Sequence, residues 1–268
     1  MRVVFGSSGR LGSAFVRQST ERGSAMLMIP WARAKTAESI PDRPCDIVFA
    51  GGLTDPKLPE SEIQKANLEF PLDIIERTRS RPGTRYLTLG TILERFPEAC
   101  SSNPYLKSKL ELGRAISSLA AESLNNGRFL HIRLHTLYGG VIQRHMFLGQ
   151  LATAIEKDTE FKMSAGTQLR EYHHVDDIAV ALDHILARAW QTSEIDLNSG
   201  EAVRLAEVAK AVFESFGKTH LLRIGALPTP AGENIDRVFE RSSGFFLPVS
   251  RRPIPGIIEW LRRNLRQA

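Results

Sequence analysis

Two side chains near the start of the stretch SSNPYLKSKLELGRAISSLAAE carry groups suited to proton transfer. Asn103 is a good N-cap and Pro104 suits the first helical position, so we expect a helix to begin there. Tyr105 then lies in the first turn and Lys109 one turn later, on the same face. An ammonium group beside a phenol, near the positive end of a helix, is expected to lower the pKa of Tyr105. The spacing therefore predicts an acid–base pair.

The chain opens with MRVVFGSSGRLGSAF, in which three glycines separate a short apolar run from a helical one. Gly6 and Gly9 allow the backbone to approach a pyrophosphate, whose charge the helix N-terminus stabilises. Gly12 allows the helix to pack close to the strand. Because the glycines lie between a first strand and a first helix, the turn is predicted to bind a dinucleotide. The residues expected to contact it are Gly6, Ser8, Gly9, Arg10, Leu11 and Gly12.

The residues after the second apolar run indicate which dinucleotide binds. An NAD site places Asp or Glu about 20 residues past the glycines, on the ribose 2′-hydroxyl, but MLMIPWARAKT contains no acid. Arg33 and Lys35 follow the run instead, and Arg10 lies in the glycine turn. Since cations suit a 2′-phosphate, this pattern favours NADP, with NAD as the alternative. The competing interpretation is that Arg33 is a solvated loop residue.

A parallel sheet is the element expected to position these groups. The predicted strands span residues 2–5, 26–29, 46–50, 85–89, 129–134 and 194–197. The predicted helices span residues 10–21, 62–79, 104–124, 176–189 and 204–216. Near-continuous apolar strands separated by helices indicate an α/β fold of the Rossmann type, a doubly wound parallel sheet covered on both faces. Prolines break this alternation over 218–256, where we expect a small C-terminal lobe.

Composition and charge argue against several other classes of protein. The 268 residues carry a net charge of +5, but the Lys and Arg residues are scattered and no aromatic or zinc-ligand motif accompanies them. We therefore expect no nucleic-acid partner. No apolar run is long enough to cross a membrane, and no leader-like segment precedes the first strand. Cys45 and Cys100 lack metal-ligand spacing, and we expect a cytoplasmic protein that binds an anionic small molecule.

The glycine turn and the Tyr105-x-x-x-Lys109 pair together resemble the short-chain dehydrogenase/reductase family. Further segments resemble its extended branch, the nucleotide-sugar epimerases, dehydratases and ketoreductases. These segments are DIVFAGG, NLEFPLDIIERTR with Asn67, IRLHTLYGG, LREYHHVDDIAVALDHIL and LNSGEAVRLAEVAKAV. The resemblance implies an NADP-binding Rossmann domain at 1–139 and 171–200, and a substrate-binding lobe at 140–170 and 201–268. It also implies that Gly51 contacts the cofactor.

The resemblance also implies catalytic roles. The family's tyrosine is the general acid or base at a sugar carbonyl or hydroxyl, its lysine holds the nicotinamide ribose, and a Ser or Thr after the fourth strand binds the same oxygen. The first two roles fall on Tyr105 and Lys109, but aligning TLGTIL with the family pattern puts Leu89 at the hydroxyl position. Strand alternation places Leu89 and Thr91 on one face and Thr88 on the other. Thr91 is therefore the candidate hydroxyl and Thr88 the alternative.

Two positions are implicated in substrate binding by the same resemblance. Arg170 matches an arginine that contacts the nucleotide diphosphate, for which a guanidinium is well suited. Its competing interpretation is an ion pair with Glu171 or Asp176. Thr136 stands where the branch often has an asparagine near the substrate. No metal is expected, because the run HHVDD at 173–177 is interpreted as aspartates that cap a helix and histidines that pack beneath it.

Taken with the cations expected around a 2′-phosphate, the resemblance implies an NADP-dependent oxidoreductase that reduces a keto-sugar carried on a nucleotide. TLGTIL lacks the acidic pair that 4,6-dehydratases carry directly after the threonine, so that activity is not expected. Two alternatives stay open: an NAD(P)-dependent nucleotide-sugar epimerase, and a non-catalytic NADP-binding protein that senses redox state. Members of the branch often dimerise through the tyrosine-bearing helix, and the apolar stripe in LELGRAISSLAAESL permits a homodimer.

Overall fold

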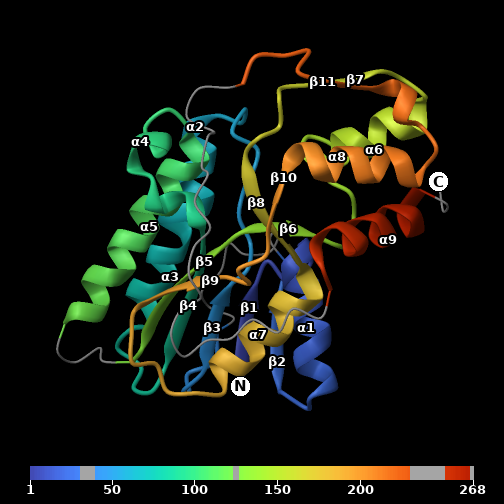
Figure 1. The fold of residues 1–268 in the computed structure, drawn as a ribbon. Coiled ribbons are helices and arrows are strands. Elements are labelled where there is room, and N and C mark those ends of the chain that lie inside the picture. Colours follow the sequence, from blue (N-terminus) through green and yellow to red (C-terminus); the bar gives the residue numbers. More distant parts are fainter. Residues whose placement is uncertain (31–39, 123–126, 230–250, 266–268) are drawn as a thin grey trace. The chain divides into compact units, whose positions relative to one another are not determined.

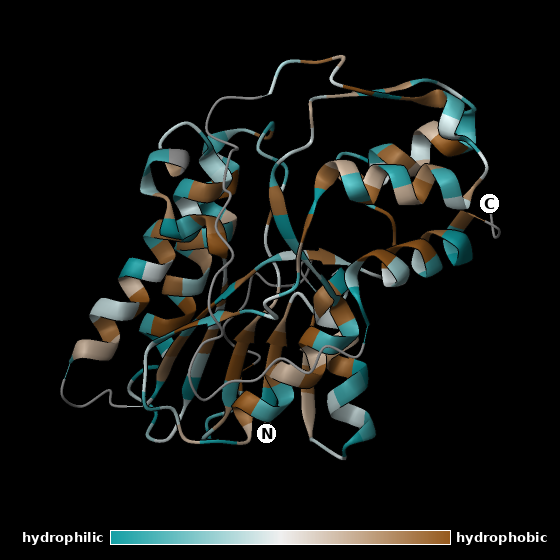
Figure 2. Ribbon diagram, in the orientation of Figure 1, coloured by the Kyte–Doolittle hydropathy of each residue, from teal (hydrophilic) through white to brown (hydrophobic). Residues whose placement is uncertain are grey.

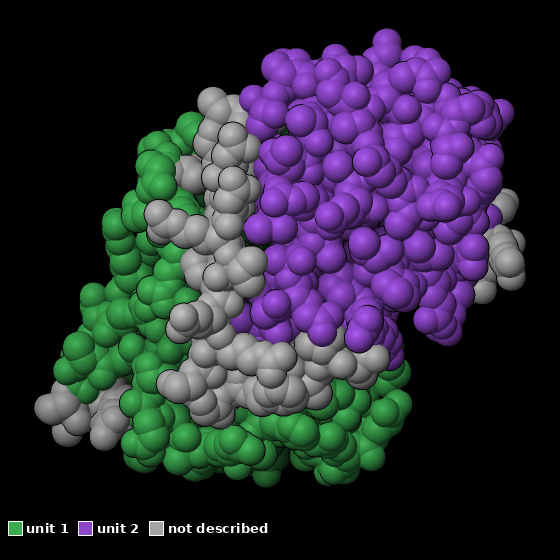
Figure 3. All heavy atoms as spheres, in the orientation of Figure 1, with its two compact units in different colours: residues 1–134, 178–197, 242–246 green, residues 135–177, 198–241, 247–268 purple. Residues whose placement is uncertain are grey.

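The computed structural model describes residues 1–30, 40–122, 127–229 and 251–265 (Figure 1). The described chain divides into two compact units, which Figure 3 colours separately. The first unit consists of Met1–Leu134 and Ile178–Leu197. The second consists of His135–Asp177 with residues 198–229 and 251–265.

A six-stranded parallel sheet forms the centre of the first unit, with the strand order β2-β1-β3-β4-β5-β9. Its strands are β1 (Arg2–Phe5), β2 (Met26–Ile29), β3 (Asp46–Phe49), β4 (Arg85–Thr91), β5 (Phe129–Leu134) and β9 (Glu194–Leu197). Every pairing in it is parallel, which confirms the predicted sheet. All six predicted strands are present, and β4 continues beyond its predicted end to Thr91.

Helices cover both faces of this sheet, with α1 and α7 on one face and α3 and α5 on the other (Figure 1). The helices that join its strands are α1 (Arg10–Glu21), α2 (Glu60–Gln64), α3 (Phe70–Thr78), α4 (Pro97–Cys100), α5 (Pro104–Ala121) and α7 (Val175–Leu186). A π-helical segment, η3 (Lys65–Glu69), separates α2 from α3 where one continuous helix was predicted. A short 3₁₀ helix, η4 (Ile92–Arg95), follows β4. None of the helices in the described ranges is long and apolar enough to cross a membrane.

The strands are apolar because helices bury both of their faces (Figure 2). Val3 and Phe5 of β1 and Ile47 and Phe49 of β3 are buried in one cluster, together with Ile116 of α5. Burying each such side chain contributes about 1.5–3 kcal/mol relative to leaving it exposed. The sequence pattern and the packing therefore agree on the interior of this unit.

A buried carboxylate joins the start of the first unit to its last helix. Asp183 on α7 accepts hydrogen bonds from Ser19 Oγ at 3.1 Å and from Arg22 Nη1 at 3.0 Å, and it also pairs with Arg2. Burial raises the pKa of Asp183, but the hydrogen bonds and positive charges around it outweigh burial and lower its pKa below the ordinary value. Asp183 thereby links β1 and α1 to α7.

The second unit has two small sheets and a separate apolar core. Its elements are β6 (Thr136–Tyr138), α6 (Phe147–Lys157), β7 (Phe161–Met163), β8 (Leu169–His174), β10 (Ala202–Arg204), α8 (Leu205–Ser215), η6 (Thr219–Leu221), β11 (Leu222–Ile224) and α9 (Pro253–Leu265). The strand order is β10-β8-β6 in one sheet and β11-β7 in the other. Tyr138, Phe213 and Trp260 belong to its core. The predicted helix at 204–216 is α8, whereas α9 was not anticipated.

Candidate active site

The glycine turn after β1 has no space for larger side chains. Gly6 adopts φ +79°, and a Cβ on it would lie 2.3 Å from Gly51 Cα in the loop after β3. A Cβ on Gly12 would lie 2.1 Å from the Gly6 carbonyl oxygen, which confirms that Gly12 lets α1 pack against the turn. The turn therefore holds the start of α1 and the end of β3 close together.

The first turn of α1 is open to an anion. Its N-cap is Gly9, which provides no side-chain hydrogen bond, and no acidic residue lies in the first turn. A phosphate at such an end is stabilised by the helix dipole. Ser8 and Gly9 are exposed, whereas the Leu11 side chain is buried, so that only its backbone is available to a ligand.

The strand order places this turn at the switch point of the sheet. β1 lies between β2 and β3. From β1 the chain adds β2 on one side of the sheet, and from β3 onward it adds strands on the other side. Ligands of open α/β sheets bind outside the carboxyl ends of the strands at such a point. The Gly6 turn follows β1 there, and Gly51 follows β3.

The start of α5 has the predicted geometry. Asn103 is the N-cap, and its side chain accepts a hydrogen bond from the Leu106 amide at 3.2 Å. Tyr105 is half-buried in the first turn. Lys109, one turn on, is buried, and its Nζ donates to the Leu89 carbonyl oxygen at 2.9 Å. The lysine is thus fixed at the carboxyl end of β4.

Asn67 in the π-helical segment holds the loop after β3 beside this lysine. Its amide donates to the Leu53 carbonyl oxygen and accepts from the Leu53 amide, both at 2.9 Å. Its Nδ2 also lies 3.1 Å from Ser108 Oγ on α5. A Cβ on Gly52 would lie 2.7 Å from Asn67 Oδ1 and 3.5 Å from Lys109 Nζ. The loop and the tyrosine-bearing helix are therefore joined at this point.

The proton affinities of the pair differ from the expectation. Burial raises the pKa of Tyr105 to about 12, the negative charge of Glu94 adds to the rise, and Arg10 partly offsets it. The predicted lowering of the Tyr105 pKa is therefore wrong for this structure. Burial also lowers the pKa of Lys109 to about 8, and Glu94 partly offsets that change. At neutral pH the pair consists of a protonated phenol and an ammonium group.

We expect dinucleotide binding to weaken as the pH rises through about 8, because Lys109 then loses its charge. The measurement is a fluorescence titration of NADPH binding at pH values on both sides of 8. Lys109→Arg is expected to remove the dependence, since an arginine stays cationic. Lys107→Ala is the control, because Lys107 is exposed and paired with Glu60. The same pH dependence in Lys109→Arg as in the wild type would contradict this assignment.

The two hydroxyl candidates on β4, and Leu89 between them, lie in different surroundings. Thr91 is half-exposed at the end of the strand, where its hydroxyl accepts a weak hydrogen bond from the Leu93 amide at 3.4 Å. Leu89 is buried. Thr88 is fully buried, with its hydroxyl 2.8 Å from His131 Nδ1, so it cannot reach a substrate oxygen. Thr91 is left as the hydroxyl candidate.

Two buried residues of the site were missed in the sequence. Glu94 accepts a hydrogen bond from the Thr91 amide, and its second oxygen lies 3.0 Å from His131 Nε2. The signals were present: T-x-x-E is the pattern of a capping box, and His131 is a polar ring within the buried strand FLHIRL.

The substrate candidates lie in the second unit. Thr136 is half-buried at the start of β6, where it pairs with Tyr172 of β8. Arg170 of β8 is half-buried, and its guanidinium donates to the Leu169 carbonyl oxygen at 2.8 Å. Arg33 and Lys35, the proposed contacts for a 2′-phosphate, lie outside the described residues.

The run HHVDD forms local polar contacts in this unit. His173 is buried, with Nε2 3.0 Å from Glu171 Oε2. His174 Nδ1 accepts a hydrogen bond from the Asp176 amide at 3.2 Å. Asp176 and Asp177 lie in the first turn of α7, where Arg251 faces both carboxylates. Among the described residues, no three His, Cys, Asp or Glu side chains form a group that could hold a metal ion.

Comparison with solved structures shows the same fold in several enzymes. UDP-glucose 4-epimerase from Thermus thermophilus, in complex with NAD, superposes with a TM-score of 0.75 at 21% identity over 100% of both chains. RMD from Pseudomonas aeruginosa, complexed with NADPH, gives a TM-score of 0.75 at 15% identity over 98% of this chain and 99% of the other. DesIV, a dTDP-glucose 4,6-dehydratase from Streptomyces venezuelae with NAD bound, gives 0.81 at 15% identity over 100% and 98%.

A sequence model of one family covers most of the chain. It is described as the NAD dependent epimerase/dehydratase family, and it matches residues 2–198. That range contains the glycine turn, the Tyr105–Lys109 pair and the whole six-stranded sheet. The chain therefore belongs to the NAD-dependent epimerase/dehydratase family, whose enzymes use a nicotinamide cofactor.

Proposed function

We propose that this enzyme uses NADPH to reduce a keto-sugar carried on a nucleoside diphosphate. The observation that carries the proposal is the Tyr105–Lys109 pair, with Lys109 fixed on the Leu89 carbonyl oxygen in the unit that contains the glycine turn. A phenol with a pKa of about 12 keeps its proton at neutral pH. A protonated Tyr105 is prepared to donate to an oxygen that gains negative charge, which is what a ketone reduction requires.

The residues of the chain have separate tasks in this reaction. The nicotinamide ring, when bound, supplies the hydride. Tyr105 donates its phenolic proton to the carbonyl oxygen of the substrate, so that hydride and proton together convert the ketone to an alcohol. The Lys109 ammonium stabilises the tyrosinate that remains, and the Thr91 hydroxyl donates a hydrogen bond to the same substrate oxygen.

The residues after Thr91 favour a reductase over a dehydratase. Ile92 and Leu93 follow it, so no carboxylate stands directly after the threonine. The nearest acid, Glu94, is buried and accepts hydrogen bonds from the Thr91 amide and from His131. Its carboxylate is therefore not available to take a proton from a sugar carbon.

The choice of NADPH rests on positive charge near the expected ribose phosphate. Arg10 is half-buried at the first position of α1, and the sequence places Arg33 and Lys35 after β2 without an acid between Glu21 and Glu38. A guanidinium binds two phosphate oxygens at once. One solved relative contains NADPH and others contain NAD.

Arg170 and Thr136 are the residues proposed to bind the nucleotide-linked substrate. Arg170 offers a guanidinium to the diphosphate, and Thr136 offers a hydroxyl to the sugar. The solved relatives with sugar nucleotides in their names, such as the UDP-glucose 4-epimerase, support this class of substrate.

The test is NADPH oxidation by the purified protein across a panel of 4-keto-6-deoxy sugar nucleotides, followed at the nicotinamide absorbance. We expect turnover with at least one of them, and a higher kcat/KM with NADPH than with NADH. No oxidation across the whole panel contradicts the reductase assignment.

An epimerase is the second candidate, because the same tyrosine and lysine serve a reaction that oxidises and then re-reduces the sugar. The solved relatives include three 4-epimerases, as well as the relative that contains NADPH. Release of tightly bound NAD from gently denatured protein supports the epimerase, whereas protein purified without a dinucleotide supports the reductase.

A further inference from the structure

A carboxylate and an imidazole are buried together beneath α5. Glu94 exposes 4% of its surface and His131 exposes none. The Thr91 amide donates to Glu94 Oε1 at 2.6 Å, which is the contact of a capping box. The other oxygen, Oε2, lies 3.0 Å from His131 Nε2 and 3.5 Å from Arg133 Nε. In a capping box the glutamate needs only the contact with the Thr91 amide. The contact between Glu94 and His131 therefore requires another explanation.

Thr88 holds the far side of the imidazole. Its Oγ1 lies 2.8 Å from His131 Nδ1 and 3.5 Å from the Leu130 carbonyl oxygen. The hydroxyl can donate to a neutral ring, or it can accept from a protonated ring while it donates to Leu130. Both protonation states of His131 therefore have hydrogen-bond partners on this side.

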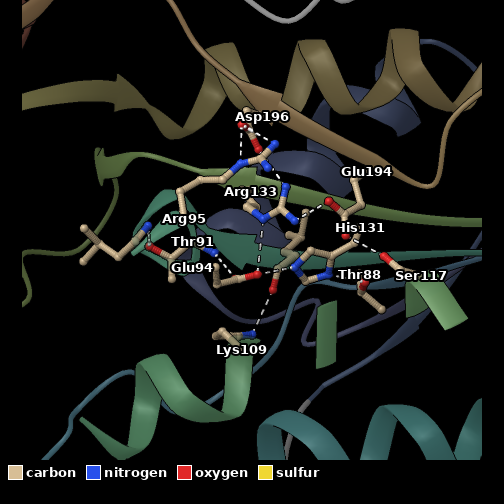
Figure 4. Close-up of polar contacts among 12 residues, drawn as sticks. Thr88, Thr91, Glu94, Arg95, Lys109, Ser117, His131, Arg133, Glu194 and Asp196 are labelled. Atoms are coloured by element: carbon tan, nitrogen blue, oxygen red, sulfur yellow. Dashed lines mark hydrogen bonds and ion pairs between the residues drawn. The ribbon is translucent and has the colours of Figure 1, made fainter. Parts of the chain in front are cut away.

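Two glycines make room for the Glu94–His131 pair, and both adjoin the Lys109 site. A Cβ on Gly90 would lie 2.2 Å from Glu94 Oε1 and from His131 Nε2, and Gly90 follows Leu89, whose carbonyl oxygen binds the lysine. A Cβ on Gly113 would lie 3.0 Å from Glu94 Oε2, and Gly113 lies one turn after Lys109 on α5. Figure 4 shows Glu94 and His131 near the end of β4, with the Lys109 side chain pointing toward this strand.

The guanidinium groups near Glu94 are shared with other carboxylates. Arg133 pairs with Glu194 and, at 2.9 Å, with Asp196, and Arg95 also pairs with Asp196 at 2.8 Å. Two guanidinium groups thus serve two carboxylates before Glu94 is considered. A buried carboxylate needs a compensating positive charge. Among the described residues, the Lys109 ammonium is a further positive charge that interacts with Glu94.

We propose that Glu94, held beneath α5 by His131, is a positioning residue whose charge keeps Lys109 cationic and Tyr105 protonated. The inference rests on the proposed function, in which both states are required. Glu94 thereby determines the pH range over which the reaction runs.

In the described part of the chain, charged and titratable groups face Glu94 from three elements. His131 and Arg133 face it from β5, Tyr105 and Lys109 from α5, and Cys100 from α4. Glu94 raises the pKa of Tyr105, opposes the lowering of the Lys109 pKa by burial, and adds to the rise that burial causes at Cys100. A negative charge stabilises the protonated form of each neighbour. The charge of Glu94 therefore acts in the same direction on the pKa of Tyr105, Lys109 and Cys100.

The test is a pH titration of lysine Cε resonances by NMR in ¹³C-labelled protein, with the wild type compared with Glu94→Gln. A glutamine still closes the capping box but carries no charge. The Lys109 resonance is identified by its loss in Lys109→Arg. We expect its midpoint to fall from about 8 by about one pH unit in Glu94→Gln. The alkaline limit of NADPH oxidation is expected to move the same way.

Glu194→Gln is the matched control, because it removes a carboxylate bound to Arg133 that does not reach the lysine. Its Lys109 midpoint is expected to match the wild type. An unchanged midpoint in Glu94→Gln, or an equal fall in both variants, overturns the proposal. If Glu94→Gln does not fold, Glu94→Asp replaces it, because the shorter side chain moves the charge away from Lys109. The Lys109 midpoint is then expected to fall by less than in Glu94→Gln, and an unchanged midpoint also overturns the proposal. The NMR titration needs no substrate, so it is independent of whether the proposed reaction is found.

Discussion

Replacing Tyr105 by phenylalanine is expected to lower kcat by about 10²–10⁴-fold, because the substrate oxygen then loses its proton donor. The helix should keep its start, since Asn103 caps α5 with its own side chain. Dinucleotide binding should also persist, since the residues expected to hold the dinucleotide lie in the glycine turn and at Lys109. The measurements are NADPH oxidation with a substrate found in the panel, and NADPH affinity by fluorescence.

Tyr138→Phe is the matched control for that change. Tyr138 lies in the core of the second unit, and its hydroxyl is buried without a hydrogen-bond partner among the described residues. Removing it deletes the same atom from another tyrosine and should leave kcat unchanged. Unchanged turnover in Tyr105→Phe would contradict the acid–base role of Tyr105. If Tyr105→Phe also functions in cells as the wild type does, a redox-sensing protein is favoured over an enzyme.

Replacing Gly6 by alanine is expected to abolish dinucleotide binding and to lower the free energy of unfolding by several kcal/mol. The left-handed backbone, with φ +79°, costs about 1–2 kcal/mol for a residue with a side chain. The added Cβ would also lie 2.3 Å from Gly51 Cα, and overpacking of this kind costs about 1–3 kcal/mol more. The turn must open to relieve the clash, which moves the backbone that is proposed to hold the phosphates.

Gly23→Ala carries the backbone cost alone, so its difference from Gly6→Ala measures the cost of the clash with Gly51. Gly23 adopts φ +77°, close to the value at Gly6, but a Cβ there would meet nothing within 4 Å. Its free energy of unfolding should fall by only about 1–2 kcal/mol, and its NADPH affinity should match the wild type. Denaturant unfolding and fluorescence titration measure both quantities. Equal losses in the two variants would show that the close approach to Gly51 is not important.

The sheet of the first unit was predictable because each of its strands has a recognisable pattern within a few neighbouring residues. Strands buried on both faces read as short apolar runs, as in RVVF and DIVF, and each is followed by a helix with its own period. The short strands of the second unit had no such signal. β6, β7, β10 and β11 span three residues each, too few to show an alternation. The helix predicted at 62–79 was interrupted by η3, where Asn67 turns toward the loop after β3.

The start of α5 was predicted correctly from the sequence, but the proton affinity of Tyr105 was not. The spacing of Tyr105 and Lys109 and the cap at Asn103 are properties of one helix. The proton affinity of Tyr105 depends instead on burial and on Glu94, which reaches the site only after β4 and α5 have packed. Contact between Glu94 and His131, 37 positions apart, is likewise a property of the folded chain.

The first unit is discontinuous in sequence, and this affects how the protein folds during synthesis. β9 completes the edge of the sheet beside β5, and Asp183 supplies the carboxylate that Arg2 and Ser19 bind. A nascent chain that ends near residue 134 therefore has an unpaired edge at β5, and its Arg2 and Ser19 lack the carboxylate of Asp183. The first unit can reach its final stability only after residue 197 has left the ribosome.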